Sequence, residues 1–269
     1  MRISKLAENI GAEVTGIDLC RPVDDATRRQ LNAAAVEHIV LVIRGQNFLP
    51  EQYLAAASLF GEPMEQHTTP YALPQCPLVH EVSSLAKDAS GQRVKFGGRW
   101  HTDHSNHQIP PKYTMLYAVR LPDSGGGTSF VDMRASYRSL PDAFKRCIAD
   151  LQTATPAFGA AKDEKGTDLA APVIHPLVRT IPDNGAKALY FHPNKTDYIV
   201  GMMPEATHTL IDELMAHTLR PEFMYTHNWK KGDMLIWDNR TVMHKANFDY
   251  DPAQHRLMHR IMIKGERPE

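Results

Sequence analysis

Residues 231–244 read KGDMLIWDNRTVMH and hold the clearest strand in the sequence. The first three residues favour a tight turn, and the short apolar run Met234–Trp237 that follows predicts a buried strand. Asp238 and Asn239 end this strand, because their short polar side chains prefer to hydrogen-bond nearby backbone. His244 lies just past the predicted strand end, so we expect its side chain to reach into the mouth of a barrel.

Further short strands and several helices are predicted on both sides of this segment. Buried or alternating apolar patterns indicate strands, and amphipathic patterns indicate helices. Pro50 suits the first turn of a helix, since its missing N–H would have no partner there. We expect strands at 39–43, 113–119, 129–133 and 223–229, and helices at 25–38, 50–60, 136–151 and 206–219.

Many short strands with a few helices are typical of an antiparallel double-sheet jelly roll, or double-stranded β-helix, with helical insertions. The fold class is then mixed α+β and mainly β. The sequence has no repeat or low-complexity linker, and 269 residues suit one large β-rich unit. We therefore predict a single domain over residues 1–269. The polar stretches 81–98 and 155–172 are expected to be loops that shape a pocket.

Composition and charge exclude several classes of protein. The formal net charge is −1 and the pI is about 6.9, so nothing favours nucleic acid or an anionic membrane as a partner. No apolar run approaches a membrane span, and the N-terminus lacks a signal-peptide pattern. Cys20, Cys76 and Cys147 are widely spaced and odd in number, which is typical of reduced thiols. We expect a cytoplasmic protein.

A candidate metal-binding pair lies in the middle of the chain. His101 and Asp103 are separated by one residue, so on an extended strand both side chains point to the same face and could chelate one ion. The pair alone is weak evidence, because 14 histidines produce about one such triplet by chance. His104 and His107 are alternative second ligands or, more simply, solvated or supporting histidines.

His244 supplies a second imidazole for the same ion. Two histidines and one carboxylate are the ligand set of a non-haem Fe(II) oxygenase with open coordination positions. Further along, Arg256 and Arg260 are four residues apart and share one face of a predicted strand. Two guanidinium groups on a partly apolar face are costly unless they meet anions. The alternative is a surface strand whose arginines are in water.

At this point the sequence resembles the taurine and 2,4-D dioxygenase (TauD/TfdA-like) family of Fe(II)/2-oxoglutarate-dependent oxygenases. The similarity covers nearly the whole chain, and its motifs occur in the family's order. These motifs are Ile10–Leu19, Trp100–Asp103, Gly125–Thr128, His175–Thr180 and Trp237–Arg260. The resemblance implies the jelly-roll fold, a dimer or tetramer, and a reaction that consumes O2 and 2-oxoglutarate and releases succinate and CO2.

The resemblance also implies roles for individual residues. His101, Asp103 and His244 would hold Fe(II). Thr128 and Arg256 would bind the distal carboxylate of 2-oxoglutarate, for which a fork-shaped guanidinium is well suited. Such an enzyme hydroxylates a C–H bond of a small anionic organic substrate and in some members cleaves a neighbouring carbon–heteroatom bond.

Candidate substrate-binding residues are less sharply indicated. Arg260 would lie near the iron and contact either the substrate anion or the co-substrate. Gly97 stands where taurine-hydroxylating members carry Asn, which argues against taurine and leaves sulfonates, sulfate esters, phenoxyalkanoates and similar carboxylates open. Four further residues could contact the substrate, namely His67, Tyr71, His192 and Lys195. For Lys195 the alternative is an exposed lysine on the surface.

A second hypothesis assigns the chain to another class of protein. A non-oxidative, cupin-like hydrolase, isomerase or small-molecule sensor would need a metal but neither O2 nor 2-oxoglutarate. It would leave Thr128 and Arg256 without a role. Detection of succinate separates the two hypotheses.

Overall fold

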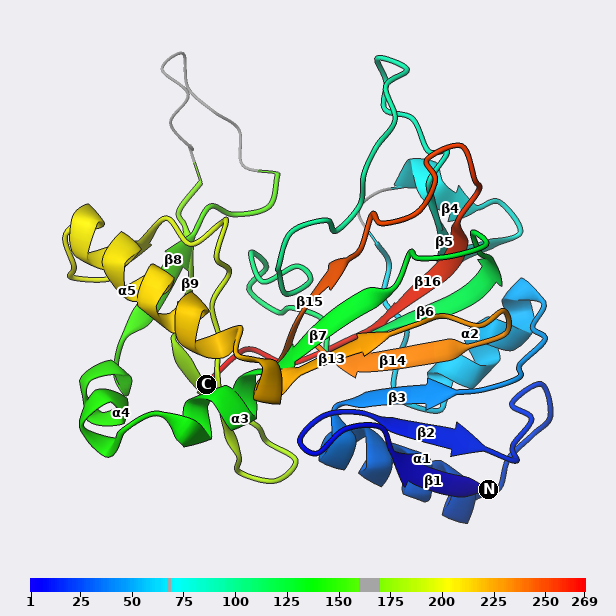
Figure 1. The fold of residues 1–269 in the computed structure, drawn as a ribbon, viewed down its shortest axis with the longest axis horizontal. Helices are drawn as coiled ribbons and strands as arrows, with labels where there is room; N and C mark the ends of the chain where they lie inside the picture. Colours follow the sequence, from blue (N-terminus) through cyan, green and yellow to red (C-terminus); the bar gives the residue numbers. More distant parts are fainter. Residues whose placement is uncertain (67–68, 160–169) are drawn as a thin grey trace.

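The computed structural model describes residues 1–66, 69–159 and 170–269. An eight-stranded sheet with the order β1-β2-β3-β14-β6-β16-β5-β4 forms its centre (Figure 1). Its strands pair antiparallel except β2 and β3, which are parallel. The strands are β1 (Arg2–Lys5), β2 (Ala12–Thr15), β3 (Val40–Ile43), β4 (Ala72–Leu73), β5 (Cys76–Ser83), β6 (Tyr113–Arg120), β14 (Met234–Asp238) and β16 (Leu257–Ile263).

A smaller antiparallel sheet packs against one face of this large sheet. It consists of β13 (Met224–His227), β7 (Thr128–Asp132) and β15 (Val242–Ala246), in the order β13-β7-β15. Phe130 from β7 contacts Trp237 from β14, with ring centroids 5.5 Å apart, inside the core that the two sheets share. The predicted double-sheet fold with helical insertions is confirmed.

Two helices cover the other face of the large sheet (Figure 1). They are α1 (Asp25–His38) and α2 (Pro50–Ser58), both close to their predicted bounds. Asp24 caps α1 by accepting a hydrogen bond from Thr27 N at 2.7 Å. Leu31 and Tyr53 are fully buried against the sheet, so the amphipathic patterns in the sequence identified the core faces.

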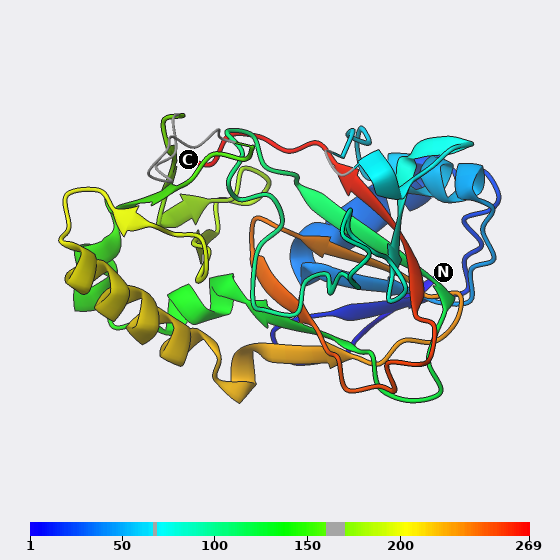
Figure 2. The same ribbon diagram turned by 90° about the horizontal axis from the view of Figure 1, so that it is seen from above.

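An insertion covers the outer face of the small sheet and extends to the end of the molecule opposite α2 (Figures 1 and 2). Val131 and Met243 from the small sheet pack there with residues of the insertion such as Leu214. The insertion and its connections contain α3 (Met133–Ser139), α4 (Asp142–Ile148), β8 (Gln152–Thr155), β9 (Val173–Pro176), β10 (Val178–Thr180), β11 (Lys187–Leu189), β12 (Tyr198–Ile199) and α5 (Pro204–Thr218), and short 3-10 turns lie at Thr69–Tyr71 and Pro221–Phe223.

One predicted helix was wrong, because residues 136–151 do not form a continuous helix. The chain makes two helices, α3 and α4, that meet at Leu140 and Pro141. Leu140 has an extended backbone, with φ −64° and ψ 147°, as expected for a residue before proline. The proline therefore ended the first helix and began the second.

The structure bears on two expectations from composition, the lack of a membrane span and the reduced state of the cysteines. No helix in the described residues is long and apolar enough to cross a membrane. Cys20, Cys76 and Cys147 are free thiols. Most of the predicted loop 155–172 lies outside the described residues.

Candidate metal and co-substrate site

The two candidate histidine ligands are brought together by backbone pairing. His101 forms an isolated antiparallel bridge with His244, with N–O distances of 3.0 and 2.9 Å. The chain then turns, and His104 has the left-handed φ of 48°. The expectation of an extended strand through His101 and Asp103 was therefore wrong. The bridge and the turn, rather than strand periodicity, bring these side chains together.

His244 also lies elsewhere than predicted. It is the middle residue of β15, paired with Phe130, rather than a residue just past a strand end. Alternation along β15 directs Met243 into the insertion core, while the ring of His244 lies 4.6 Å from that of Trp237 between the sheets. The imidazole is thus held by the core and not by a loop.

The three candidate ligands form one compact cluster. Their donor atoms all lie within 4.8 Å of one another. Asp103 Oδ1 is 3.5 Å from His101 Nε2, and Asp103 Oδ2 is 3.7 Å from His244 Nε2. Ligands that are each about 2.1 Å from one ion, at angles of about 90–120°, are separated by about 3.0–3.6 Å. The two carboxylate–imidazole separations are close to this range, so a single divalent cation can be held after a small inward movement of the side chains.

The surroundings of both imidazoles suit a metal ligand. His101 Nδ1 lies 2.7 Å from the carbonyl oxygen of Arg99, to which it must donate, so Nε2 is the ring nitrogen left to face a metal. Burial, with a smaller effect of His101, lowers the pKa of His244 to about 3 and keeps that ring neutral.

Asp103 is held by a chain of buried hydrogen bonds that sequence reasoning missed. Trp237 Nε1 donates to Asn239 Oδ1 at 3.1 Å, and Asn239 Nδ2 donates to Thr114 Oγ1 at 2.8 Å. The hydroxyl of Thr114 then donates to Asp103 Oδ2 at 2.7 Å. An indole N–H only donates, so the direction of every bond in the chain is fixed and it ends on an ionised carboxylate.

The neighbouring groups also favour the ionised form of Asp103. Burial alone raises the pKa of its carboxyl group, but the adjacent His244, His101 and Arg260 together hold it well below the usual value. A carboxylate with fixed orientation and charge is what a metal site requires.

The three candidate ligands line a cavity that is also lined by the buried cation Arg256. Arg256 is only 7% exposed, and its Nε donates to Gly126 O at 3.0 Å. Its Nη2 is buried and has no hydrogen-bond partner among the described residues. Burial lowers the pKa of Arg256 to about 10. An unsatisfied buried guanidinium is costly, so this wall of the cavity fits a carboxylate ligand.

Thr128 offers a hydroxyl on the same wall. It is the first residue of β7 and is buried. Trp229 Nε1 donates to Thr128 Oγ1 at 3.0 Å, which leaves the hydroxyl hydrogen of Thr128 to donate elsewhere. Thr128 and Arg256 line one cavity with His101 and His244, as the resemblance implied.

Arg260 lines this cavity as well, beside Asp103. The alternative of two arginines on a surface strand in water is wrong for this pair, because Arg256 is buried and burial lowers the pKa of Arg260. Arg260 Nε donates to Gln66 Oε1 at 2.7 Å.

The remaining candidate substrate residues lie at different distances from the cluster. His67 lies outside the described residues. Tyr71 packs edge-on against Phe96, with centroids 5.1 Å apart, and Phe96 in turn lines the cavity. The buried ring of His192 lies 6.3 Å from that of His101, and burial together with the charge of Lys195 lowers the pKa of His192 to about 3. Lys195 is exposed, in agreement with its alternative reading as a surface lysine.

Gly97 has a steric reason to be glycine. Its φ is +70°, and a Cβ atom would come within 3.1 Å of His101 Cε1. An Asn at this position would crowd a candidate metal ligand. The departure from the taurine-hydroxylating pattern is thus accommodated by the local backbone.

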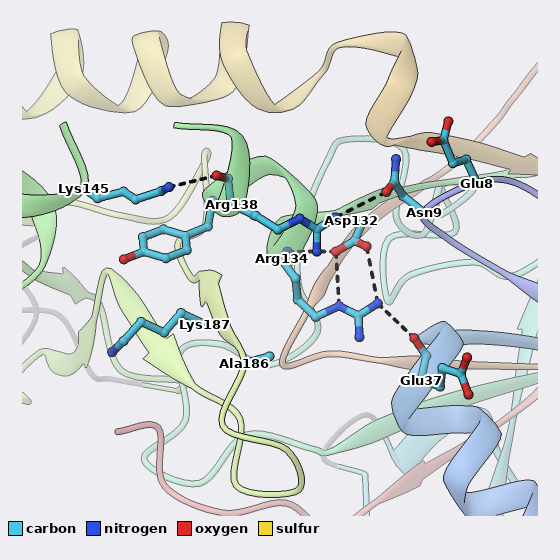
Figure 3. A pocket seen from close by; sticks show the side chains of 10 residues that line it. Glu8, Asn9, Glu37, Asp132, Arg134, Arg138, Lys145, Ala186 and Lys187 are labelled. Atoms are coloured by element: carbon cyan, nitrogen blue, oxygen red, sulfur yellow. Dashed lines mark hydrogen bonds and ion pairs between the residues drawn. The ribbon is translucent and has the colours of Figure 1, made fainter. Parts of the chain in front are cut away.

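A second cavity, of about 500 Å³, lies beside α3 (Figure 3). Its lining carries four cations and three carboxylates, and several of these groups are already paired with protein atoms. Arg134 pairs with Asp132 at 3.4 Å, and Lys145 Nζ donates to Arg138 O at 2.8 Å. The metal-ligand cluster and the unused donor of Arg256 therefore distinguish the first cavity as the candidate site.

The chain is similar over almost its whole length to known dioxygenases. The family model "Taurine catabolism dioxygenase TauD, TfdA family" matches residues 2–262. The alpha-ketoglutarate-dependent 2,4-dichlorophenoxyacetate dioxygenase of Burkholderia sp. (strain RASC) is 31% identical, over 95% of this chain and 91% of the relative. The alpha-ketoglutarate-dependent sulfate ester dioxygenase of Pseudomonas putida is also 31% identical, over 99% and 90%.

A solved structure agrees with these relatives. The crystal structure of AAD-2 in complex with Mn(II) and N-oxalylglycine matches with a TM-score of 0.83 at 31% identity, over 99% of this chain and 98% of that chain. Alpha-ketoglutarate is 2-oxoglutarate, so the family implies this co-substrate and a metal. The chain belongs to the TauD/TfdA family and is a 2-oxoglutarate-dependent dioxygenase.

Proposed function

We propose that this protein is an Fe(II)/2-oxoglutarate-dependent dioxygenase that hydroxylates a C–H bond of a small anionic organic molecule. His101, Asp103 and His244 hold Fe(II). The observation that carries the proposal is the combination, in one cavity, of this three-ligand cluster and the buried Nη2 of Arg256, which no residue in the described part of the chain pairs. A site for a metal alone would leave that cation without an anion.

Arg256 and Thr128 anchor the distal carboxylate of 2-oxoglutarate. The guanidinium supplies the counter-charge, and the Thr128 hydroxyl donates because its oxygen already accepts from Trp229. Gly126 allows this approach, since a Cβ atom there would lie 3.3 Å from Arg256 Cδ. These contacts fix the co-substrate at the end remote from the metal.

When both are bound, Fe(II) and 2-oxoglutarate supply the oxidising chemistry with O2, releasing succinate and CO2. The protein's own contribution is orientation. The hydrogen-bond chain from Trp237 holds Asp103, the backbone bridge holds His101 against His244, and the two sheets enclose the cavity. A substrate C–H held at a fixed position next to the metal reacts without an entropic search.

The cavity also indicates the chemical class of the substrate. Arg260 offers a positive charge, while Val82, Phe96 and Leu116 offer apolar surface. An anionic head with an apolar body matches both, and the relatives named above act on a phenoxyacetate and on sulfate esters. We propose a sulfonate, sulfate ester, phenoxyalkanoate or similar carboxylate, with His192, Lys195, Tyr71 and His67 as surrounding contacts.

A substrate panel tests this proposal. The iron-loaded enzyme is supplied with 2-oxoglutarate, O2 and one compound of each class, and succinate is measured. We expect succinate formation to rise with at least one anionic compound and to disappear in His101→Ala. His208→Ala, on α5, is the matched control and keeps activity. Metal binding without succinate from any compound would favour a non-oxidative metal protein instead.

We further propose one domain over residues 1–269, a cytoplasmic location, and a homodimer or homotetramer. None of these depends on the metal site. Light scattering on the purified protein tests the oligomer, and a monomer at micromolar concentration would contradict it. Limited proteolysis tests the single domain, which predicts that no stable half of the chain is released.

A further inference from the structure

Gln66 is a buried residue, 4% exposed, that has no part in the function proposed above. Its Oε1 accepts the hydrogen bond from Arg260 Nε at 2.7 Å. Its Nε2 donates to the carbonyl oxygens of Leu78 at 3.3 Å and Arg260 at 3.2 Å. Carbonyl oxygens only accept, so these two contacts identify the amide nitrogen and leave the amide oxygen facing the guanidinium.

The fold places Gln66 at the point where β5 separates from β16. The pairing of these two strands ends with His80 opposite Arg260. Beyond this point Pro63 bridges Ile263, so the segment that precedes Gln66 continues the antiparallel pairing with β16. The side chain of Gln66 fills the gap between the two partners of β16. It is therefore fixed by backbone on both sides.

This arrangement fixes Arg260 without cancelling its charge. Among the described residues, Gln66 is the hydrogen-bond partner of the Arg260 side chain, and the contact uses Nε. Because this contact uses Nε, it leaves the two terminal nitrogens available to a ligand in the cavity that Arg260 lines. A neutral amide holds the guanidinium plane, whereas a carboxylate at the same place would form an ion pair and compete with an anionic ligand.

We propose that Gln66 is a positioning residue that sets the affinity of Arg260 for an anionic group in the cavity. The inference rests on the proposed function. The anionic group is a carboxylate, sulfonate or sulfate, and it belongs either to the organic substrate or to 2-oxoglutarate itself. Gln66 acts through Arg260 and does not touch the reacting atoms.

Two substitutions separate positioning from folding. Gln66→Glu keeps an acceptor beside Arg260 but neutralises its charge, and Gln66→Met removes the acceptor. Gln46→Glu is the matched control: Gln46 is also 4% exposed, and its amide also donates to two carbonyls, those of Ile17 and Arg44 at 2.9 and 2.8 Å. Gln46 does not line the cavity.

Binding is measured by calorimetry on the Mn(II)-loaded protein, which avoids turnover. The probes are 2-oxoglutarate alone, and then 2,4-dichlorophenoxyacetate and hexyl sulfate with 2-oxoglutarate saturating. We expect Gln66→Glu to weaken the binding of at least one probe about tenfold or more. Its melting temperature should be close to that of Gln46→Glu, because both variants replace a buried amide that donates to two carbonyl oxygens. Gln66→Met should weaken the binding of the same probe, and Gln46→Glu should not weaken the binding of any probe. A loss for 2-oxoglutarate alone assigns Arg260 to the co-substrate, and a loss for the other anions assigns it to the substrate.

Two outcomes overturn the inference and are distinguishable. If Gln66→Glu binds every probe that the wild type binds with wild-type affinity, the positioning role is wrong while the proposed function stands. The same holds if loss of affinity follows loss of melting temperature across all three variants. If the wild type binds neither 2-oxoglutarate nor the other anions, the proposed function fails and this inference fails with it.

Discussion

Replacing Thr114 by valine tests whether the buried hydrogen-bond chain supports the metal site. Thr114→Val keeps the shape of a side chain that is fully buried but removes the donor to Asp103 Oδ2. It also leaves Asn239 Nδ2 without an acceptor. A hydrogen bond to a charged group contributes about 1.5–3 kcal/mol, and loss of a group that orients a metal ligand weakens metal binding about 10–100-fold.

The assay is titration of the metal-free protein with Mn(II) in competition with a chelator, together with urea unfolding. We expect the Mn(II) affinity of Thr114→Val to fall about 10–100-fold. Thr218→Val is the control, because Thr218 is equally buried and its hydroxyl bonds Ser136 at 2.9 Å, in the insertion. If both variants lose a similar free energy of unfolding but bind Mn(II) as tightly as the wild type, the hydrogen-bond chain does not support the metal site.

Three further perturbations have defined outcomes. Arg256→Met should raise KM for 2-oxoglutarate about 100-fold, because it removes the buried counter-charge, with succinate formation as the readout; an unchanged KM would place the distal carboxylate elsewhere. Gly97→Asn should lower both the melting temperature and the Mn(II) affinity, because φ is +70° and Cβ crowds His101, and wild-type values would show that the backbone yields freely. Burial lowers the pKa of His80 to about 4 and of His244 to about 3, below the value of about 6.5 in an unfolded chain, so the unfolded metal-free chain binds protons first. Its free energy of unfolding should therefore be highest above pH 6.5 and fall as the pH drops towards 4, and urea curves that coincide from pH 7.5 to 5 would contradict this.

Parts of the site could be predicted from the sequence where a local motif was strong or where a residue would be energetically costly without a ligand. Arg256 and Arg260 were placed on one wall because two guanidinium groups on an apolar strand need anions, and both line the cavity. The convergence of His101 and Asp103 was expected for the wrong reason. A bridge to His244, 143 positions along the chain, replaced the predicted strand periodicity.

The supporting residues were missed because their partners are distant in sequence. Thr114 contacts Asp103 and Asn239, which are 11 and 125 positions away, and Gln66 contacts Arg260 across 194 positions. No local pattern separates such residues from ordinary buried polar side chains. The break at Pro141, by contrast, had a plain signal in the sequence, since the residue before a proline disfavours helix.

The visible absorption of the protein with Fe(II) and 2-oxoglutarate, in the absence of O2, tests the iron site most directly. We expect a weak charge-transfer band that requires both additions. His101→Ala should abolish this band, and Arg256→Met should make it appear only at a higher 2-oxoglutarate concentration. A wild-type protein without the band, or a band that His101→Ala leaves unchanged, would contradict the assignment of this cavity as the site of iron and its co-substrate.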